Sequence, residues 1–296
     1  MDRGAVPLVF GDLTEYLRQP IEEIAREYWA YREGADRSAQ ERVANATNPA
    51  DVLAYYAATP HYLYELSYWE ASLDKQAWLR VAALACRRFK CGRVLDFGGG
   101  VGGTALTLNR CGIPCAYLDV AGKTFEYASW RFARHGVAVR MVDAAGSGQR
   151  RDGSYDAIFA WDVLEHLFDL EEALGTIHGM LRSDGLCISK STFATSGSPH
   201  EAIHLAQHAC YDDVNTFNGL MARCGFRFAG QLKPNRLSRL LRACGWRYAV
   251  AGIRIAPRLK HGGNFLLHVK ASLPAADGAR EVPEESANGV GDAARR

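Results

Sequence analysis

The spacing of apolar residues divides the chain into a helical N-terminal part and a later part in which strands and helices alternate. Up to about residue 90, apolar side chains recur every three or four positions, as on the buried face of a helix. Two runs carry this pattern: Ile21, Ile24, Ala25 and Tyr28, and then Trp78, Val81, Ala82 and Ala85. The pattern predicts an N-terminal helical extension or lid over residues 1–90.

From Cys91 onward, short apolar runs typical of buried strands alternate with helical patterns. Seven runs are predicted as strands: Arg93–Phe97, Cys115–Leu118, Val137–Val142, Asp156–Ala160, Leu186–Ser189, Phe226–Ala229 and Phe265–Val269. The clearest helix runs from Leu170 to Leu181, and Ser183-Asp184-Gly185 follows it as a turn. This alternation predicts an α/β domain over residues 91–271 with a doubly wound, seven-stranded, mostly parallel sheet that binds ligands at the carboxyl ends of its strands.

Composition narrows the class of protein further. The 296 residues are 48% hydrophobic and 23% charged, as in soluble globular proteins, and residues 272–296 lack periodicity and are predicted as a disordered tail. No signal-peptide pattern and no apolar run approaching ~20 residues occurs, so we expect a cytoplasmic protein without a membrane partner. None of the eight cysteines forms a C-x-x-C pair, which argues against a zinc ribbon or a thioredoxin-type site. Several lie inside apolar runs, such as Cys187, and are predicted as small buried side chains in a reducing compartment.

Positive charge is concentrated in one segment, although the net charge of the chain is only +2. Residues 214–276 contain eleven Lys and Arg and no Asp or Glu, and Arg236, Arg239 and Arg242 are spaced three apart on a predicted helix. A solvated basic face accounts for this pattern. Contact with an anionic partner, such as nucleic acid or an acidic carrier protein, is the other interpretation.

A glycine-rich turn follows the first predicted strand. Asp96 closes that strand, and five glycines follow between positions 98 and 103. Glycines let a backbone turn sharply and let a ligand come close, and the helical pattern that follows brings a helix N-terminus to the same place. Gly98, Gly100 and Gly103 also satisfy G-x-G-x-x-G, so the turn alone predicts a nucleotide-type cofactor and leaves a nicotinamide dinucleotide open.

Acidic residues after the next three strands make the pattern specific. Asp119 and Asp143 end the second and third strands, and the fourth ends in Trp161-Asp162-Val-Leu-Glu165-His166. With the glycine turn, these segments resemble the ordered motifs of the class I S-adenosylmethionine-dependent methyltransferases, in particular the small-molecule, ubiquinone-pathway-like branch. The resemblance extends over about residues 90–270, with Asp184-Gly185 where the family usually has Pro-Gly.

The resemblance implies a Rossmann-like domain that binds S-adenosylmethionine. The glycine turn would pass under the methionyl part with support from Asp96, Asp119 would take the ribose hydroxyls, and Asp143 with the backbone of Ala144 would meet the adenine. Trp161 and Asp162 would lie near the sulfonium and the acceptor. The predicted cofactor-binding residues are Asp96, Gly98, Gly100, Gly102, Asp119, Asp143, Ala144 and Asp162.

His166 is the first candidate for a catalytic base. A base assists transfer to a hydroxyl, because a phenol titrates near ~10. A packing or capping role for this histidine stays open. Asp162, Glu165 and His166 also resemble the D/E-x-x-E-H cluster with which ubiquinone-pathway O-methyltransferases and small-RNA 2′-O-methyltransferases hold a divalent ion, so a metal at these three residues is a further alternative.

A second histidine motif lies downstream. His200-Glu-Ala-Ile-His204 matches H-E-x-x-H, and with His208 the spacing would place three imidazoles on one helix face, as in zinc peptidases. Its position after the fifth strand argues against a peptidase, because in methyltransferases of this family that loop commonly lines the acceptor pocket. We therefore predict His204 as a second catalytic residue, with His200 near the acceptor, an extra metal ligand or a packed histidine stripe as alternatives.

An aromatic cluster lies in the N-terminal part: Tyr55, Tyr56, Tyr62, Tyr64, Tyr68 and Trp69. These side chains pack a helical layer onto the domain, or they form a wall over a substrate pocket. We expect in-line methyl transfer to a hydroxyl or other heteroatom of a small-molecule acceptor. The alternatives are an RNA or carrier-protein-bound substrate held by residues 214–276, and a cofactor-binding subunit without catalysis.

Overall fold

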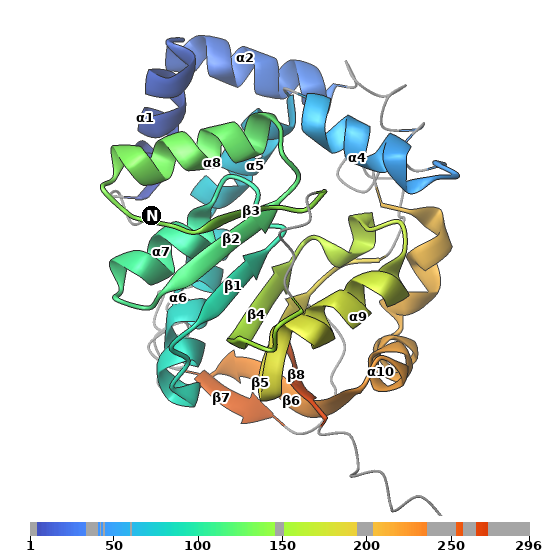
Figure 1. Cartoon of the computed structure of the whole chain (residues 1–296). Coiled ribbons are helices and arrows are strands. Elements are labelled where there is room, and N and C mark those ends of the chain that lie inside the picture. The colour runs from blue at the N-terminus through green and yellow to red at the C-terminus, as the bar shows by residue number, and fades with distance from the viewer. Residues whose placement is uncertain are drawn as a thin grey trace, which may run out of the picture.

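A mixed sheet of eight strands, in the order β3-β2-β1-β4-β5-β8-β6-β7, forms the centre of the computed structural model (Figure 1). The structure describes residues 5–33, 41, 43, 45–59, 61–145, 151–193, 204–235, 253–256 and 265–271. The strands are β1 (Val94–Phe97), β2 (Cys115–Asp119), β3 (Met141–Asp143), β4 (Tyr155–Trp161), β5 (Leu181–Lys190), β6 (Phe226–Pro234), β7 (Ile253–Ala256) and β8 (Phe265–Lys270).

Strands β1 to β5 pair in parallel, whereas β8, β6 and β7 join by antiparallel pairs. The predicted α/β class and doubly wound sheet are confirmed, but the sheet has eight strands, not seven. The added strand, β7, is a four-residue edge strand that pairs only with β6 in the described sheet. An edge strand this short buries few side chains, so its apolar pattern is weak.

Two helical layers cover the sheet because its buried strands alternate side chains between the two faces. Phe159 packs toward α6 (Leu73–Phe89), α7 (Gly103–Arg110) and α8 (Lys123–Arg134). Its neighbour Ile158 packs toward α9 (Leu170–Met180) and α10 (Val214–Arg223) on the other face. The cofactor-type turn between β1 and α7 is therefore held between a fully buried strand and a buried helix.

The helix predicted over residues 170–181 is α9, capped by Asp169, whose side chain accepts a hydrogen bond of 2.8 Å from the Glu172 N–H. The turn predicted after it forms a bulge inside β5. Tyr155 of β4 pairs with Leu181, and two residues later Ala157 pairs with Leu186, so residues 182–185 loop out of the ladder. The helix and strand thus adjoin directly, without the separate connection that the glycine indicated.

The helices before the sheet are α1 (Ala5–Leu17), α2 (Ile21–Arg32), α4 (Pro49–Ala58) and α5 (His61–Ala71). Together with α8, helices α1, α2 and α5 enclose a small core of their own that includes Leu13, Ile24, Leu63 and Tyr127. Helices α1, α2 and α4 lie at the upper end of the molecule in Figure 1. The predicted tail at residues 272–296 and the helix carrying Arg236, Arg239 and Arg242 lie outside the described residues.

Over the described ranges, no helix has the length and apolar character needed to cross a bilayer. The seven cysteines within these ranges all carry free thiols.

Candidate functional site

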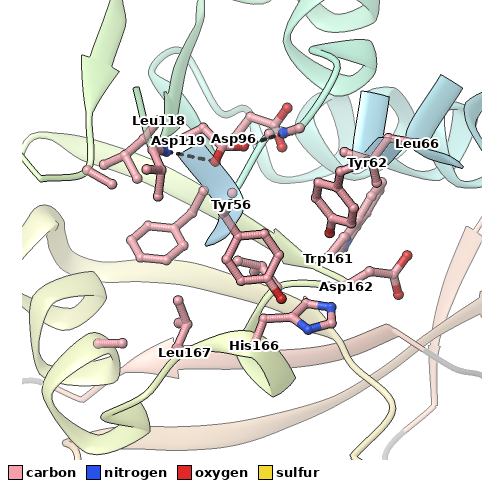
Figure 2. A pocket seen from close by; sticks show the side chains of 18 of the residues that line it. Tyr56, Tyr62, Leu66, Asp96, Leu118, Asp119, Trp161, Asp162, His166 and Leu167 are labelled. Atoms are coloured by element: carbon pink, nitrogen blue, oxygen red, sulfur yellow. Dashed lines mark hydrogen bonds between the residues drawn. The ribbon is translucent and has the colours of Figure 1, made fainter. Parts of the chain in front are cut away.

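A cavity of about 630 Å³ lies at the carboxyl ends of β1, β2 and β4, and helices α4 and α5 form its opposite wall. Seven of the ten predicted cofactor-binding and catalytic residues line it: Asp96, Gly98, Gly100, Asp119, Ala144, Asp162 and His166. The other three are not among its lining residues: Gly102, Asp143 and His204. Figure 2 shows the cavity, with Asp96 and Asp119 at one side and His166 at the other.

The glycine turn takes a backbone path that side chains would obstruct. Gly98 and Gly100 have φ angles of 71° and 53°, in the left-handed region. Asp119 fixes the turn by accepting a hydrogen bond of 2.6 Å from the Gly100 N–H. Gly102 is the N-cap residue of α7 and packs against Phe132, to which a Cβ would come within 2.7 Å. Gly102 therefore shapes the turn from behind.

The two carboxyl groups beside the turn, those of Asp96 and Asp119, are shielded from solvent. Asp96 is 4% exposed, and its Oδ2 accepts a hydrogen bond of 3.2 Å from the Ala105 N–H. Burial raises the pKa of Asp96 to about 7, against the lowering effect of Lys75. Burial likewise raises the pKa of Asp119 to about 6, although the N–H groups of Gly100 and Val120 stabilise its charged form. Both sites thus favour a cationic ligand that would restore ionisation.

Asp143 holds the loops around the cavity. Its Oδ1 accepts hydrogen bonds from the N–H groups of Ala121, at 3.2 Å, and Ala145, at 3.0 Å. The neighbouring Ala144 donates its N–H to the Asp119 carbonyl at 2.8 Å. Ala144 and Ala145 consequently line the cavity with their backbone and small side chains, while Asp143 braces them.

A buried carboxylate occupies the N-terminus of α7. Glu70 of α5 is 5% exposed and contacts Gly103, the first residue of that helix, so closely that a Cβ there would overlap its carboxylate. Arg131 of α8 binds Glu70 through Nη2 at 2.9 Å and the Val101 carbonyl through Nη1 at 2.7 Å. A dinucleotide places its pyrophosphate at this helix N-terminus. The position of Glu70 therefore disfavours the nicotinamide alternative.

Asp162 is positioned by the N-terminal helices. It follows β4 with a left-handed φ of 52°, and its Oδ2 accepts a hydrogen bond of 3.0 Å from Nε1 of Trp69 on α5. Nζ of Lys75, on α6, lies 3.8 Å from the same oxygen. Sequence analysis identified neither Lys75 nor Glu70, because each is a single polar residue on an otherwise ordinary amphipathic helix.

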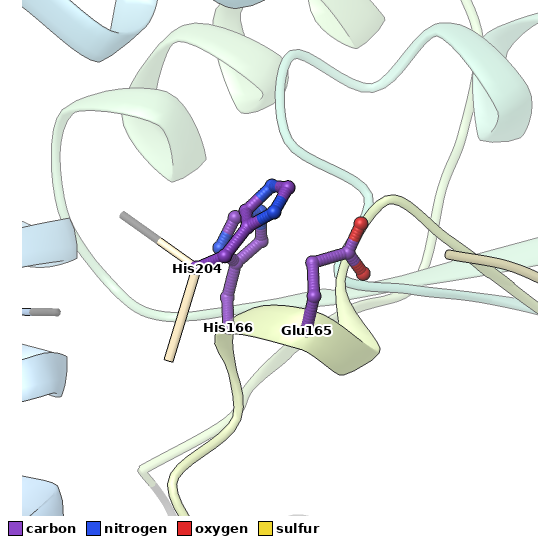
Figure 3. A group of neighbouring side chains, drawn as sticks. All are labelled: Glu165, His166 and His204. Carbon is purple, nitrogen blue, oxygen red and sulfur yellow. The ribbon is translucent and has the colours of Figure 1, made fainter. Parts of the chain in front are cut away.

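His166 ends the short 3₁₀ helix η1 (Leu164–His166) and faces the cavity (Figure 2). Glu165, His166 and His204 form a cluster of possible metal ligands (Figure 3). A carboxylate oxygen of the first and one ring nitrogen of each histidine all lie within 4.8 Å of one another. Glu165 is 2% exposed, and among the described residues its Oε2 has no hydrogen-bond partner. Burial and the nearby Asp162 raise the pKa of Glu165 to about 7. The cluster differs from the predicted metal set, since His204 takes the place of Asp162.

The downstream histidines do not form a zincin-type helix in the described part of the chain. His208 lies on the 3₁₀ helix η2 (Ala206–Asp212), which begins after His204. Its Nε2 is 2.7 Å from the Leu167 carbonyl, so it joins the loop after η1 to η2. His200 lies outside the described residues. Of the two described histidines of the motif, His204 lies beside His166 and Glu165, whereas His208 joins the two loops.

Some members of the N-terminal aromatic cluster form a wall of the cavity, and others pack within the helical layer. Tyr56 and Tyr62, with Trp69, line the cavity. Tyr55 and Tyr64 are 9% exposed each and pack within the helical layer. The ring centroid of Tyr56 lies 5.8 Å from that of His166, in an edge-to-face arrangement. The helical extension thus contributes directly to the cavity that carries the sequence motifs.

Residues 68–229, more than half of the chain, match the profile of a protein family described as a methyltransferase domain. No curated protein matches the sequence. Among similar solved structures are an S-adenosylmethionine-dependent methyltransferase from Thermotoga maritima (16% identity, 70% of this chain and 95% of that chain, TM-score 0.47) and one from Clostridium acetobutylicum (11%, 70% and 98%, 0.47). Another is an O-methyltransferase family protein from Burkholderia thailandensis (15%, 71% and 60%, 0.47).

Proposed function

The chain belongs to the class I S-adenosylmethionine-dependent methyltransferases, and from this membership we propose that it methylates a hydroxyl or another heteroatom of a small-molecule acceptor. The family membership confirms the predicted activity and its cofactor, S-adenosylmethionine. The observation that supports the acceptor type is the shared cavity. His166 faces the same space as the glycine turn, Asp96 and Asp119, so a base and the cofactor residues adjoin one cavity.

The charge of the cavity suits this cofactor, which carries a sulfonium and an ammonium group. In the described part of the chain, its lining includes the ammonium of Lys75 and six carboxylates: Glu70, Asp96, Asp119, Asp162, Asp169 and Glu172. We assign Asp96 and the glycine turn to the methionyl part, Asp119 to the ribose hydroxyls and Ala144 to the adenine. In this scheme Gly102 and Asp143 act by bracing the turn and the adenine loop.

When bound, S-adenosylmethionine supplies a methyl group whose bond to sulfur breaks, with the electron pair returning to sulfur, as an acceptor lone pair forms the new bond to carbon. The protein aligns the acceptor by enclosing it between α4, α5 and η1, which replaces a bimolecular encounter with a fixed geometry. His166 takes the proton that a hydroxyl acceptor loses. The His204 ring packs edge-to-face against the imidazole of His166, with centroids 5.1 Å apart, and so limits its orientation.

Turnover and cofactor binding, measured separately, test this proposal. Replacing His166 by Gln is expected to lower the rate of S-adenosylhomocysteine formation by roughly 10²–10⁴-fold with a hydroxyl acceptor, because the base is lost. The dissociation constant for S-adenosylhomocysteine should stay unchanged. His178→Gln, on α9 and outside the cavity lining, is the matched control. Binding without turnover, across all acceptor pools, would instead favour the non-catalytic subunit.

Metal-assisted transfer is a second candidate, favoured by the grouping of Glu165, His166 and His204. Two imidazoles and one carboxylate form a donor set that suits transition-metal ions such as zinc or manganese. These residues would hold the ion beside the acceptor, where it would polarise the hydroxyl. Metal analysis of the purified protein and of His204→Ala, followed by turnover after EDTA treatment and dialysis, tests this candidate. Full turnover in metal-free protein would reject it.

An RNA or carrier-protein-bound acceptor, engaged through residues 214–276, is the remaining alternative. Part of that segment lies outside the described residues. Retention on RNA or on an acidic carrier that falls steeply with added salt would favour it, because phosphate contacts release counterions.

A further inference from the structure

We propose that the acceptor end of the cavity selects an uncharged, largely apolar hydroxyl compound, and that the Tyr56 hydroxyl holds the acceptor oxygen beside His166. The inference rests on the proposed function and names a substrate class for that site. It assigns Tyr56 a role in acceptor binding, carried by an element outside the methyltransferase motifs.

The acceptor end is the part of the cavity that lies away from Asp96 and Asp119. Its walls are mostly apolar and come from α4, α5 and the segment after η1: Pro49, Val52, Leu53, Tyr62, Leu167 and Phe168. Tyr56 points toward His166 across this space (Figure 2). Apolar and aromatic walls with few convergent polar groups are typical of sites for small organic ligands.

The Tyr56 hydroxyl is poised for a ligand atom. Its oxygen is buried, and no described residue supplies a hydrogen-bond partner for it. The ring is held by two aromatic contacts, a tilted one with Tyr62 at a centroid distance of 5.3 Å and an edge-to-face one with Tyr55 at 5.4 Å. Buried hydroxyls are almost always paired in proteins, so a hydroxyl that its ring orients and that lacks a partner among the described residues is available to an oxygen or nitrogen of a ligand. Burial also raises the pKa of the phenol, which keeps its proton available for donation.

The electrostatics exclude an anionic acceptor. Among the described lining residues the ammonium is that of Lys75, which is already 3.8 Å from Asp162 and 4.9 Å from the Trp78 ring centroid. The carboxylates in the lining would repel a phosphate or carboxylate brought into the same desolvated space. An uncharged acceptor needs no cationic partner and is not repelled by the carboxylates. Its hydroxyl can accept a hydrogen bond from Tyr56 and lose its proton to His166.

Three naphthalene probes test the inference in protein saturated with S-adenosylhomocysteine. The dissociation constants of 2-naphthol, naphthalene and 2-naphthyl phosphate are measured by titration calorimetry. We expect 2-naphthol to bind about 3- to 10-fold more tightly than naphthalene, the contribution of one hydrogen bond. The phosphate should bind at least roughly tenfold more weakly than 2-naphthol because of the acidic lining. In Tyr56→Phe, which keeps His166 as a partner for the hydroxyl, the preference for 2-naphthol over naphthalene should fall below that of the unchanged protein.

Tyr68→Phe is the matched control, because that tyrosine is 47% exposed and lies outside the cavity lining. It should keep the full preference for the hydroxyl. Equal or tighter binding of the phosphate, no saturable binding of 2-naphthol, or an undiminished preference in Tyr56→Phe would each overturn the inference. Saturation with S-adenosylhomocysteine is established first, so a defective cofactor site and a wrong acceptor class give different results.

Discussion

At the scale of single residues, the site depends on two carboxyl groups, Asp96 and Asp119, that the fold buries although burial disfavours their charged forms. Asp96 and Asp119 have pKa values raised to about 7 and about 6. Without a cationic ligand, a fraction of each is therefore protonated near neutral pH. Since their folded-state pKa values exceed the unfolded ones, the folded protein binds more protons, and its free energy of unfolding falls as pH rises from about 4 through these values.

Cofactor affinity is expected to change with pH in the opposite direction. A cationic ligand favours the ionised carboxylates, so binding lowers both pKa values and releases protons. The affinity for S-adenosylmethionine should therefore rise between about pH 5 and 8. Calorimetry near neutral pH in two buffers of different ionisation enthalpy measures the proton release. Asp119→Asn should bind weakly and release fewer protons, whereas an affinity independent of pH would contradict the assignment.

At the scale of elements, one helix brings the acceptor wall to the methyltransferase domain. Helix α4 begins at an Asn48 cap, whose side chain accepts a hydrogen bond of 3.0 Å from the Asp51 N–H, followed by proline at the first helical position. Its far end rests on the loop after β2. The Ala57 carbonyl would lie 2.5 Å from a Cβ at Gly122, so glycine permits this close approach. The position of Tyr56 thus depends on Gly122.

Substituting Gly122 by Ala is expected to displace α4 and raise the KM for the acceptor. The φ of Gly122 is 167°, which any residue adopts, so the effect arises from contact with Ala57 and not from backbone strain. Steady-state kinetics should show a larger change in the acceptor KM than in the KM for S-adenosylmethionine. Gly175→Ala, in α9 with open space around it, is the control and should be neutral or up to about 1 kcal/mol more stable. Equal changes in both KM values would contradict a specific role for α4.

Local patterns predicted the elements whose burial is continuous. Strands such as β1 and β4, and the helix α9, read clearly in the sequence because they are buried along one face or on both. The edge strand β7 and the bulge at the start of β5 were missed, because neither produces a long apolar period. Position in the sheet, rather than propensity, decides their conformation.

At the scale of the whole molecule, the site is assembled from residues far apart in the sequence. The motif residues could be predicted because each follows its own strand. The bond from Trp69 to Asp162 spans 93 positions, and the bond from Arg131 to Asp12 spans 119. Contacts of this range leave no periodic signal, so Glu70, Lys75 and the role of Tyr56 emerged only from the fold.

Arg131 joins the N-terminal helices to the cofactor turn. It is 1% exposed, and its guanidinium binds Asp12 of α1 at 3.0 Å, Glu70 of α5 and the Val101 carbonyl of the turn. Replacing it by Met is expected to lower the free energy of unfolding by ~3–5 kcal/mol, because the buried carboxylate of Glu70 loses its guanidinium partner and that of Asp12 keeps only His135. Urea unfolding measures this loss. The free energy of unfolding of Arg131→Lys should lie between those of the unchanged protein and Arg131→Met, since lysine keeps the charge but not the forked geometry of the guanidinium.

The same substitution is expected to weaken cofactor binding, since Glu70 and Val101 both line the cavity. The triple variant Asp12→Asn, Glu70→Gln and Arg131→Met separates the two effects. It removes the unpaired charges and should recover part of the stability, because neutral groups are easier to bury. It does not restore the hydrogen bond to Val101, so affinity for S-adenosylhomocysteine should stay reduced. If affinity recovered together with stability, the network would serve folding alone, and the turn would hold its shape through Asp119 and the glycines.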